Sequence, residues 1–193
     1  MKPIRGRGKR QQGASLIEVL VTLVILMLGL LGLVGLMLHS QRSQQESYQR
    51  VQALVLLEDM ANRIRTNRKA APCYVFTTAG SGTPYLGTGA TAVPACTTGT
   101  VEQQARAIND MNEWSDLLAG NSEMLGANPV GAMLGARGCV ELAAPDVYRV
   151  SVVWQGGSET FPPAAEVTCG SGQYGTEPHR RAVSVNLQIA KLS

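Results

Sequence analysis

Residues 13–38 read GASLIEVLVTLVILMLGLLGLVGLML, and this stretch decides the fold. From residue 19 to residue 38 the run carries no charge, and Thr22 is its only polar side chain. As a helix, such a run rises roughly 30 Å, which is the thickness of the hydrocarbon core of a bilayer. The stretch therefore predicts a helix that can span a membrane.

A basic segment and a single carboxylate come before the apolar run. Residues 1–13 read MKPIRGRGKRQQG, and Glu18 is the fifth residue after Gly13. Basic residues ahead of a span hold that end in the cytoplasm and direct the rest of the chain across the membrane. A charge inside an apolar helix is unfavourable by a few kcal/mol or more, so Glu18 indicates a specific partner.

This arrangement resembles the class III signal of type IV prepilins, in which a basic leader ends in Gly. The match consists of Gly13, Ala14, Ser15, Leu16, Ile17 and Glu18. The resemblance implies that a prepilin peptidase cuts between Gly13 and Ala14, that Ala14 is then N-methylated, and that Glu18 acts in filament assembly. Ala14 departs from the Phe or Met that most often begins a mature pilin. Two further segments, CVELAAPDVYRVSVVWQG at 139–156 and LEDMANRIR at 57–65, look like the PilV-type minor pilins.

Two simpler interpretations of the N-terminus are weaker. A secretory signal has an apolar core of about 7–15 residues followed by a small-residue cleavage site. Here the run is longer, and His39 and Ser40 follow without such a site. A plain single-span anchor leaves Glu18 unexplained. We therefore expect a leader at 1–13, a transmembrane or filament-core half of the first helix at 14–38, an amphipathic half at 39–71 and a periplasmic globular domain at 72–193.

The charge balance is a topology signal and excludes a nucleic-acid footprint. The net charge of +3 comes from 17 basic and 14 acidic residues, and five of the basic ones lie in the leader, so 12 remain against 14 after its removal. The four cysteines, Cys73, Cys96, Cys139 and Cys169, form no C-x-x-C pair. In an exported domain an even count indicates disulfides, and four cysteines allow three connectivities. We favour Cys73–Cys96 and Cys139–Cys169 because each closes a short loop within one subregion.

The first helix is expected to continue without a break from residue 15 to about residue 68. No Pro or Gly occurs from residue 36 to residue 71, and Pro72 is expected to end the helix. In the distal half, apolar residues recur at helical spacing and predict the face that packs on a small β domain: Tyr48, Val51, Leu54, Val55, Ala61 and Ile64.

The remainder predicts one short helix and an antiparallel sheet. Thr100 and Gln103 form a capping-box pattern ahead of a helix at 101–119, and Gly120 ends it. Alternation predicts strands at 139–142, 147–154, 166–169 and 181–190, with a further short strand at 74–76. The fold class is therefore α+β: a pilin-like lollipop in which a long N-terminal helix packs on a small antiparallel sheet, with a second short helix.

No active site, cofactor or metal site is expected. The chain has no nucleotide loop, H-E-x-x-H or G-x-S-x-G pattern, and His39 and His179 are isolated. The resemblance implies a minor pilin that helps to prime pilus assembly, with roles in twitching motility and adhesion. Its implied partners are other minor and major pilins, the prepilin peptidase and the inner-membrane assembly platform. A minor pseudopilin of type II secretion and a membrane-anchored periplasmic binding domain remain alternatives.

Overall fold

The structure is a computed structural model that describes residues 15–90, 92–121, 124–126, 128–129 and 133–190. The chain divides into two compact units, Met1–Gln44 and Gln45–Ser193. The first helix, α1 (Leu16–Thr66), contributes residues to both units. It begins and ends within two residues of the predicted bounds.

The second unit contains a four-stranded antiparallel sheet in the order β1-β4-β5-β6. Strands β4 (Arg137–Ala144), β5 (Val147–Gln155) and β6 (Arg180–Gln188) form the expected meander. Two-residue strand β1 (Leu86–Gly87), which the sequence analysis missed, pairs with the edge of β4. A separate small ribbon pairs β2 (Met124–Leu125) with β3 (Asn128–Pro129).

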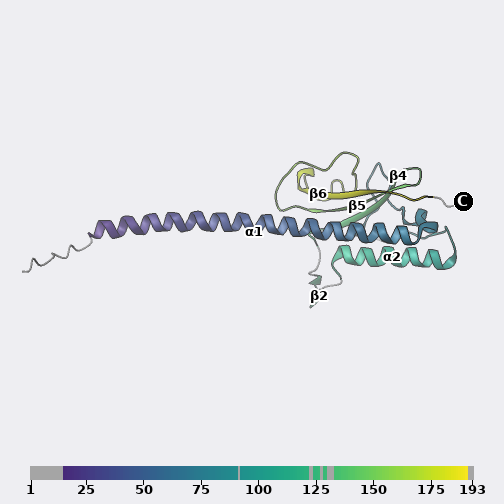
Figure 1. The fold of residues 1–193 in the computed structure, drawn as a ribbon, viewed down its shortest axis with the longest axis horizontal. Helices are drawn as coiled ribbons and strands as arrows, with labels where there is room; N and C mark the ends of the chain where they lie inside the picture. The colour runs from purple at the N-terminus through teal and green to yellow at the C-terminus, as the bar shows by residue number, and fades with distance from the viewer. Residues whose placement is uncertain (1–14, 91, 122–123, 127, 130–132, 191–193) are drawn as a thin grey trace, which may run out of the picture. The chain divides into compact units, whose positions relative to one another are not determined.

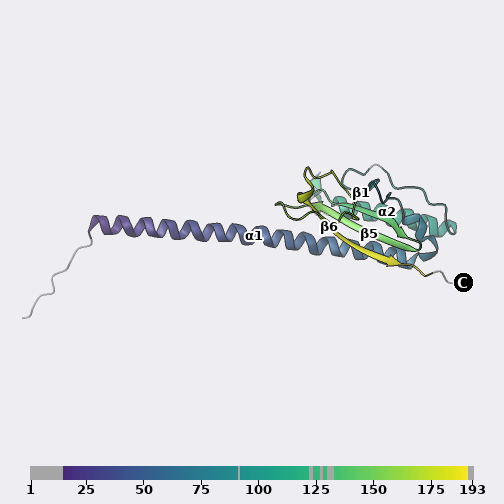
Figure 2. The ribbon, with the colours of Figure 1, turned by 90° about the horizontal axis from the view of Figure 1, so that it is seen from above.

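One face of this sheet is covered by two helices, the distal half of α1 and α2 (Val101–Ala119) (Figures 1 and 2). The helices run antiparallel, since Asn67 contacts Gln103 near one end and Leu56 contacts Trp114 further along. Trp114 is fully buried, and its indole Nε1 donates to the Leu56 carbonyl oxygen at 2.8 Å. The predicted α+β architecture, a long helix packed on an antiparallel sheet with a shorter second helix, is confirmed.

Local signals define both ends of α2. The Thr100 side chain accepts from the backbone N–H of Gln103, and the Gln103 side chain accepts from the backbone N–H of Thr100. This capping box satisfies two N–H groups that a helix start leaves free. Gly120 adopts φ 76°, a left-handed conformation that glycine reaches without strain. The predicted bounds of this helix are those observed.

Both favoured disulfides are present. Cys73–Cys96 ties the short 3-10 helix η1 (Arg68–Tyr74) to the segment before α2. Cys139–Cys169 joins β4 to the long β5–β6 connection and, with Val153 and Tyr174, forms a second small core. This core covers part of the sheet face that lies opposite the helices.

Three local predictions were wrong. Helix α1 ends at Thr66, close to the expected end, but Pro72 is not what ends it, because Pro72 lies inside η1. Asn67 leaves the helical conformation (φ −113°, ψ 42°), and its side-chain amide donates to the Gln103 carbonyl and the Tyr74 hydroxyl. The end of the helix is thus set by contacts to α2 and η1, which sequence periodicity does not reveal.

The two other errors are strands that did not form. In the predicted strand 74–76, Tyr74 belongs to η1 instead, and the N–H groups of Phe76 and Thr77 both donate to one carbonyl, that of Val140. In the predicted strand 166–169, the carbonyls of Val167 and Cys169 accept from the Arg180 guanidinium. A side chain there provides the hydrogen bonds that a neighbouring strand would have supplied.

Candidate assembly surface

The N-terminal part of α1 is apolar on all sides. Within residues 16–38 every large apolar side chain is exposed, from 47% at Val21 to 84% at Leu16. α1 is long and apolar enough to cross a membrane, and it is the one such helix among the described residues. Its Thr22 hydroxyl donates to the Val19 carbonyl at 2.8 Å, so this polar group is satisfied within the helix.

Three glycines face open space in this segment. A Cβ placed on Gly29, Gly32 or Gly35 would meet no atom within 4 Å outside the helix itself. Packing within the described chain therefore does not explain these glycines, although each is less favourable than Ala in a helix interior by about 1 kcal/mol. Small residues in a membrane helix let another helix approach closely.

Glu18 lies in the first turn of α1. Its backbone N–H donates to the Ser15 carbonyl at 2.9 Å, and the Val19 N–H reaches the same oxygen at 3.2 Å. Among residues 15–90, 92–121, 124–126, 128–129 and 133–190, no ion-pair partner of the Glu18 carboxylate is found. The predicted cleavage and methylation residues, Gly13 and Ala14, lie outside the described residues.

The distal half of α1 carries an apolar stripe that faces away from the sheet. Tyr48, Val51 and Val55 are 57–70% exposed, and Leu54 is 44% exposed. These four residues were predicted to lie in the core, and that prediction was wrong. Only Ala61 and Ile64 of the predicted face are buried, and the packing face is completed by four residues outside that prediction: Ala53, Leu56, Leu57 and Met60.

The reason is that this half of α1 has two apolar faces. At 100° per residue, Tyr48, Val51 and Val55 lie opposite Ala53 and Met60. Both faces have helical spacing, so periodicity detects them without choosing between them. The outward stripe, defined here as Tyr48, Val51 and Val55, is therefore an exposed face. Its helical spacing was correctly recognised in the sequence, but its residues were wrongly assigned to the core.

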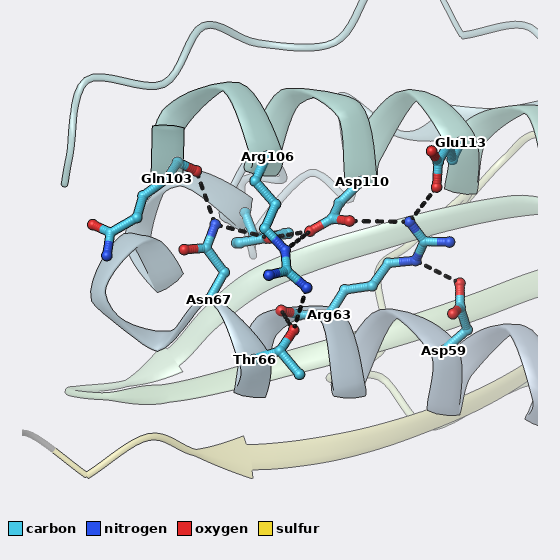
Figure 3. Close-up of polar contacts among 9 residues, drawn as sticks. Asp59, Arg63, Thr66, Asn67, Gln103, Arg106, Asp110 and Glu113 are labelled. Atoms are coloured by element: carbon cyan, nitrogen blue, oxygen red, sulfur yellow. Dashed lines mark hydrogen bonds and ion pairs between the residues drawn. The ribbon is translucent and has the colours of Figure 1, made fainter. Parts of the chain in front are cut away.

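A polar cluster holds α1 against α2 (Figure 3). Arg63 contacts Asp59 at 2.8 Å, Asp110 at 3.1 Å and Glu113 at 2.7 Å. The Tyr74 hydroxyl donates to the other oxygen of the Asp110 carboxylate, and burial together with this hydrogen bond raises the pKa of Tyr74. Each of these groups is satisfied by its neighbours, so the cluster is a structural clasp.

The described residues contain no group of three His, Cys, Asp or Glu side chains placed to hold a metal ion. The candidate site is thus a surface for assembly: an exposed apolar helix with one carboxylate at its start, and an outward stripe further along. Such a surface can bury apolar area against a partner and can pair one negative charge.

Two family models match consecutive parts of the chain. A model described as the prokaryotic N-terminal methylation motif matches residues 8–34, and one described as type IV pilin Tt1218 matches residues 35–112. The searches of curated proteins and of solved structures gave no match. With the fold described above, these matches identify the chain as a type IV pilin-like protein.

The first match defines the chain more closely. The chain carries the N-terminal methylation motif at residues 8–34. Together with the apolar helix, this motif fits an inner-membrane anchor followed by a C-terminal domain. The match to a pilin model supports a structural subunit and indicates association with a membrane and with other pilus components.

Proposed function

We propose that the protein is a minor pilin of a type IV pilus, one that enters the filament and helps to prime its assembly, with roles in twitching motility and adhesion. The precursor sits in the inner membrane with its leader in the cytoplasm and its C-terminal domain in the periplasm. The peptidase cuts between Gly13 and Ala14 and methylates the new amine. Other minor and major pilins and the inner-membrane assembly platform are its partners, and the pilus carries it to the cell surface.

The observation that carries this proposal is the uncovered apolar surface of α1. Residues 16–38 bury none of their large apolar side chains within the described chain. Burying one such side chain contributes about 1.5–3 kcal/mol, so this segment requires either lipid or other apolar helices. A bundle of equivalent helices in a filament provides the second environment once the subunit leaves the membrane.

Glu18 sets the register of that bundle. Among apolar helices its carboxylate needs a positive partner, and the amine of Ala14 on a neighbouring subunit is a suitable one. Breaking a buried ion pair by removing one member typically destabilises by about 3–5 kcal/mol. A subunit that is out of register would leave both charges unpaired.

The test is incorporation of a Glu18→Ala variant. We expect normal leader cleavage but a strong loss of the tagged subunit from sheared filaments, measured by blotting against whole cells. The matched control is Glu58→Ala, because Glu58 is an exposed carboxylate on the same helix and lies 4.0 Å from the Arg65 guanidinium. Wild-type incorporation of Glu18→Ala would refute the role given to Glu18.

Processing is tested separately by intact mass and N-terminal sequencing. We expect the mature chain to begin with N-methylated Ala14, and we expect Gly13→Val to retain the leader. A mature protein that retains Met1 or Lys2 would instead indicate a membrane-anchored binding domain. Loss of exoprotein secretion with intact twitching in a deletion strain would indicate a pseudopilin.

A further inference from the structure

Strand β6 forms one edge of the sheet, and this edge is open (Figure 2). Across the β5–β6 ladder, the N–H of Gly156 donates to the His179 carbonyl, and the N–H of Ile189 donates to the Asp146 carbonyl. Because backbone groups alternate in direction along an antiparallel strand, the odd-numbered residues of β6 face β5 and the even-numbered ones face away. Four residues thus have outward backbone groups, for which no hydrogen-bond partner is found in the described part of the chain: Ala182, Ser184, Asn186 and Gln188.

The two edges of the sheet differ in how they are protected. At the opposite edge β1 has only two residues, and the pairing of β4 with β5 is irregular between Leu142 and Ala144. β6 instead pairs with β5 in one unbroken register over nine residues, and its segment 182–188 contains no Pro and no charged residue. Short strands, charges, prolines and bulges are the usual means of keeping an edge from pairing with another chain. Segment 182–188 lacks them and is suited to accept an added strand.

The side of β6 that faces the helices is apolar and only partly covered. Val183 and Val185 pack against the main core but stay half-buried, whereas Val150 and Val152 on the neighbouring strand β5 are fully buried. A strand added beside β6 would cover these two valines with the side chains of every second residue. The edge therefore favours a partner strand with apolar residues at alternate positions.

A positively charged groove lies at the C-terminal end of β6. This groove has a volume of about 330 Å³ and is lined by residues of η1, of the β4–β5 turn and of the segment after β6, among them Arg68, Lys69, Asp146 and Ile189. Arg68 and Lys69 are exposed, and neither forms an ion pair with another described residue. Two cations against the single carboxylate of Asp146 favour a negatively charged group in the groove.

The direction of β6 decides between a second copy of the chain and a different protein as the partner. Arg181, near the start of β6, contacts Glu46 at 3.4 Å, whereas Ile189, just after its end, lines the groove with Arg68. β6 therefore runs in the same direction as the distal half of α1. Antiparallel pairing of two β6 strands would point the two α1 helices in opposite directions, and subunits in one membrane or filament share one direction. This geometry favours another protein.

We propose that the edge of β6 binds an extended segment of another protein as an added antiparallel strand. The segment lies along residues 182–188, takes up the outward hydrogen bonds of Ser184 and Asn186, and has apolar residues at alternate positions. Because it runs opposite to β6, its N-terminal end lies at the groove, where a carboxylate meets Arg68 and Lys69. The site uses neither Glu18 nor the apolar start of α1, so its test does not require a pilus.

The test is binding of a labelled synthetic peptide, acetyl-ETVTVTVT-amide, to the full-length protein in detergent micelles. Its threonines would oppose the four outward residues of β6, and its glutamate would reach the groove. We expect saturable binding by fluorescence anisotropy. In NMR, the peptide should slow hydrogen exchange of the Ser184 and Asn186 amides by at least about tenfold. The Val183 and Val185 amides, which face β5, should be protected already without the peptide.

A matched pair of peptides tests the backbone contact. N-methylation of two threonines removes donors that face β6, and we expect it to abolish binding. N-methylation of two valines gives a peptide of the same mass, but the blocked donors face away from β6, so binding should be retained. Replacing the glutamate by glutamine should weaken binding.

Variants of the protein test the same contacts from the other side. Ser184→Pro removes an outward N–H without removing a bond to β5, as prolines on edge strands do, and it should abolish binding. Ser184→Ala is the control and should bind normally. The double change Arg68→Gln and Lys69→Gln should reduce binding of the glutamate peptide to that of the glutamine peptide. Arg42→Gln, at an exposed position on α1, should have no effect.

The two methylated peptides decide the outcome even if Ser184→Pro fails to fold. Equal binding of both, no protection of the Ser184 amide, or equal binding of the glutamate and glutamine peptides would each overturn the proposal. A concentration-dependent dimer of the wild-type protein that Ser184→Pro abolishes, measured by sedimentation, would also overturn it by identifying a second copy as the partner.

Discussion

The two halves of α1 are both rich in apolar residues, but they differ in what covers them. Residues 16–38 are exposed on every side, whereas the distal half buries one face, including Met60 and Ile64, under the sheet and α2. The same helix therefore depends on two different environments. The distal half is stabilised by its own chain, and the first half needs lipid or other helices.

The largest expected effect on stability comes from the contacts that cover the distal half of α1. Trp114→Ala removes a fully buried side chain and its hydrogen bond to Leu56, and we expect unit 45–193 to lose about 3–5 kcal/mol of unfolding free energy. Urea denaturation followed by circular dichroism measures this, and the protein should still fractionate with membranes. Val101→Ala, at a 75% exposed position of the same helix, should change stability by no more than about 0.5 kcal/mol. Equal losses in both variants would contradict the assigned core.

A smaller effect is expected from the clasp between the helices. Arg63→Met leaves Asp110, which is 8% exposed, with one fewer cationic partner, and we expect a loss of about 1–3 kcal/mol in unfolding free energy. Arg65→Met is the control, since Arg65 is half-exposed and lies 4.0 Å from Glu58; we expect at most about 1 kcal/mol. If Arg65→Met destabilised as much as Arg63→Met, the clasp would not be a specific contact.

The smallest effect on stability is expected at the outward stripe. Val55→Glu places a charge at a position that is 62% exposed, so the unfolding free energy should change by no more than about 0.5 kcal/mol. Incorporation into sheared filaments should nevertheless fall, because a neighbouring apolar helix would have to bury the new charge. Gln45→Glu adds the same charge at an exposed polar position and should incorporate normally. Normal incorporation of Val55→Glu would show that the stripe lies outside the subunit contacts.

The elements that could be predicted from sequence alone are those set by local signals. Helix α2 begins at its capping box and ends at Gly120 as predicted, because both signals act through bonds within a few residues. In β5, Tyr148, Val150, Val152 and Trp154 alternate and are all buried. The prepilin signal, with Gly13, Ala14 and Glu18, is likewise local, although its processing stays a prediction.

Contacts between residues far apart in the chain determined the features that could not be predicted from the sequence. Arg180 occupies the carbonyls that a strand at 166–169 would have used, and Asn67 ends α1 through its bonds to α2 and η1. The contacts of Arg137 with the rings of Tyr85 and Tyr174 gave no signal in the sequence, since the three residues lie far apart in the chain and meet only when it folds.

By itself the sequence determined the apolar membrane-length helix, its charged start, the second helix and the three long strands. Each of these follows from hydrophobic spacing or capping chemistry within one segment. The tertiary structure alone decided which of the two apolar faces of distal α1 meets the sheet. Ala53 and Ala61 are fully buried on the chosen face, where small side chains allow the sheet and helix to approach, and this fit depends on both surfaces together.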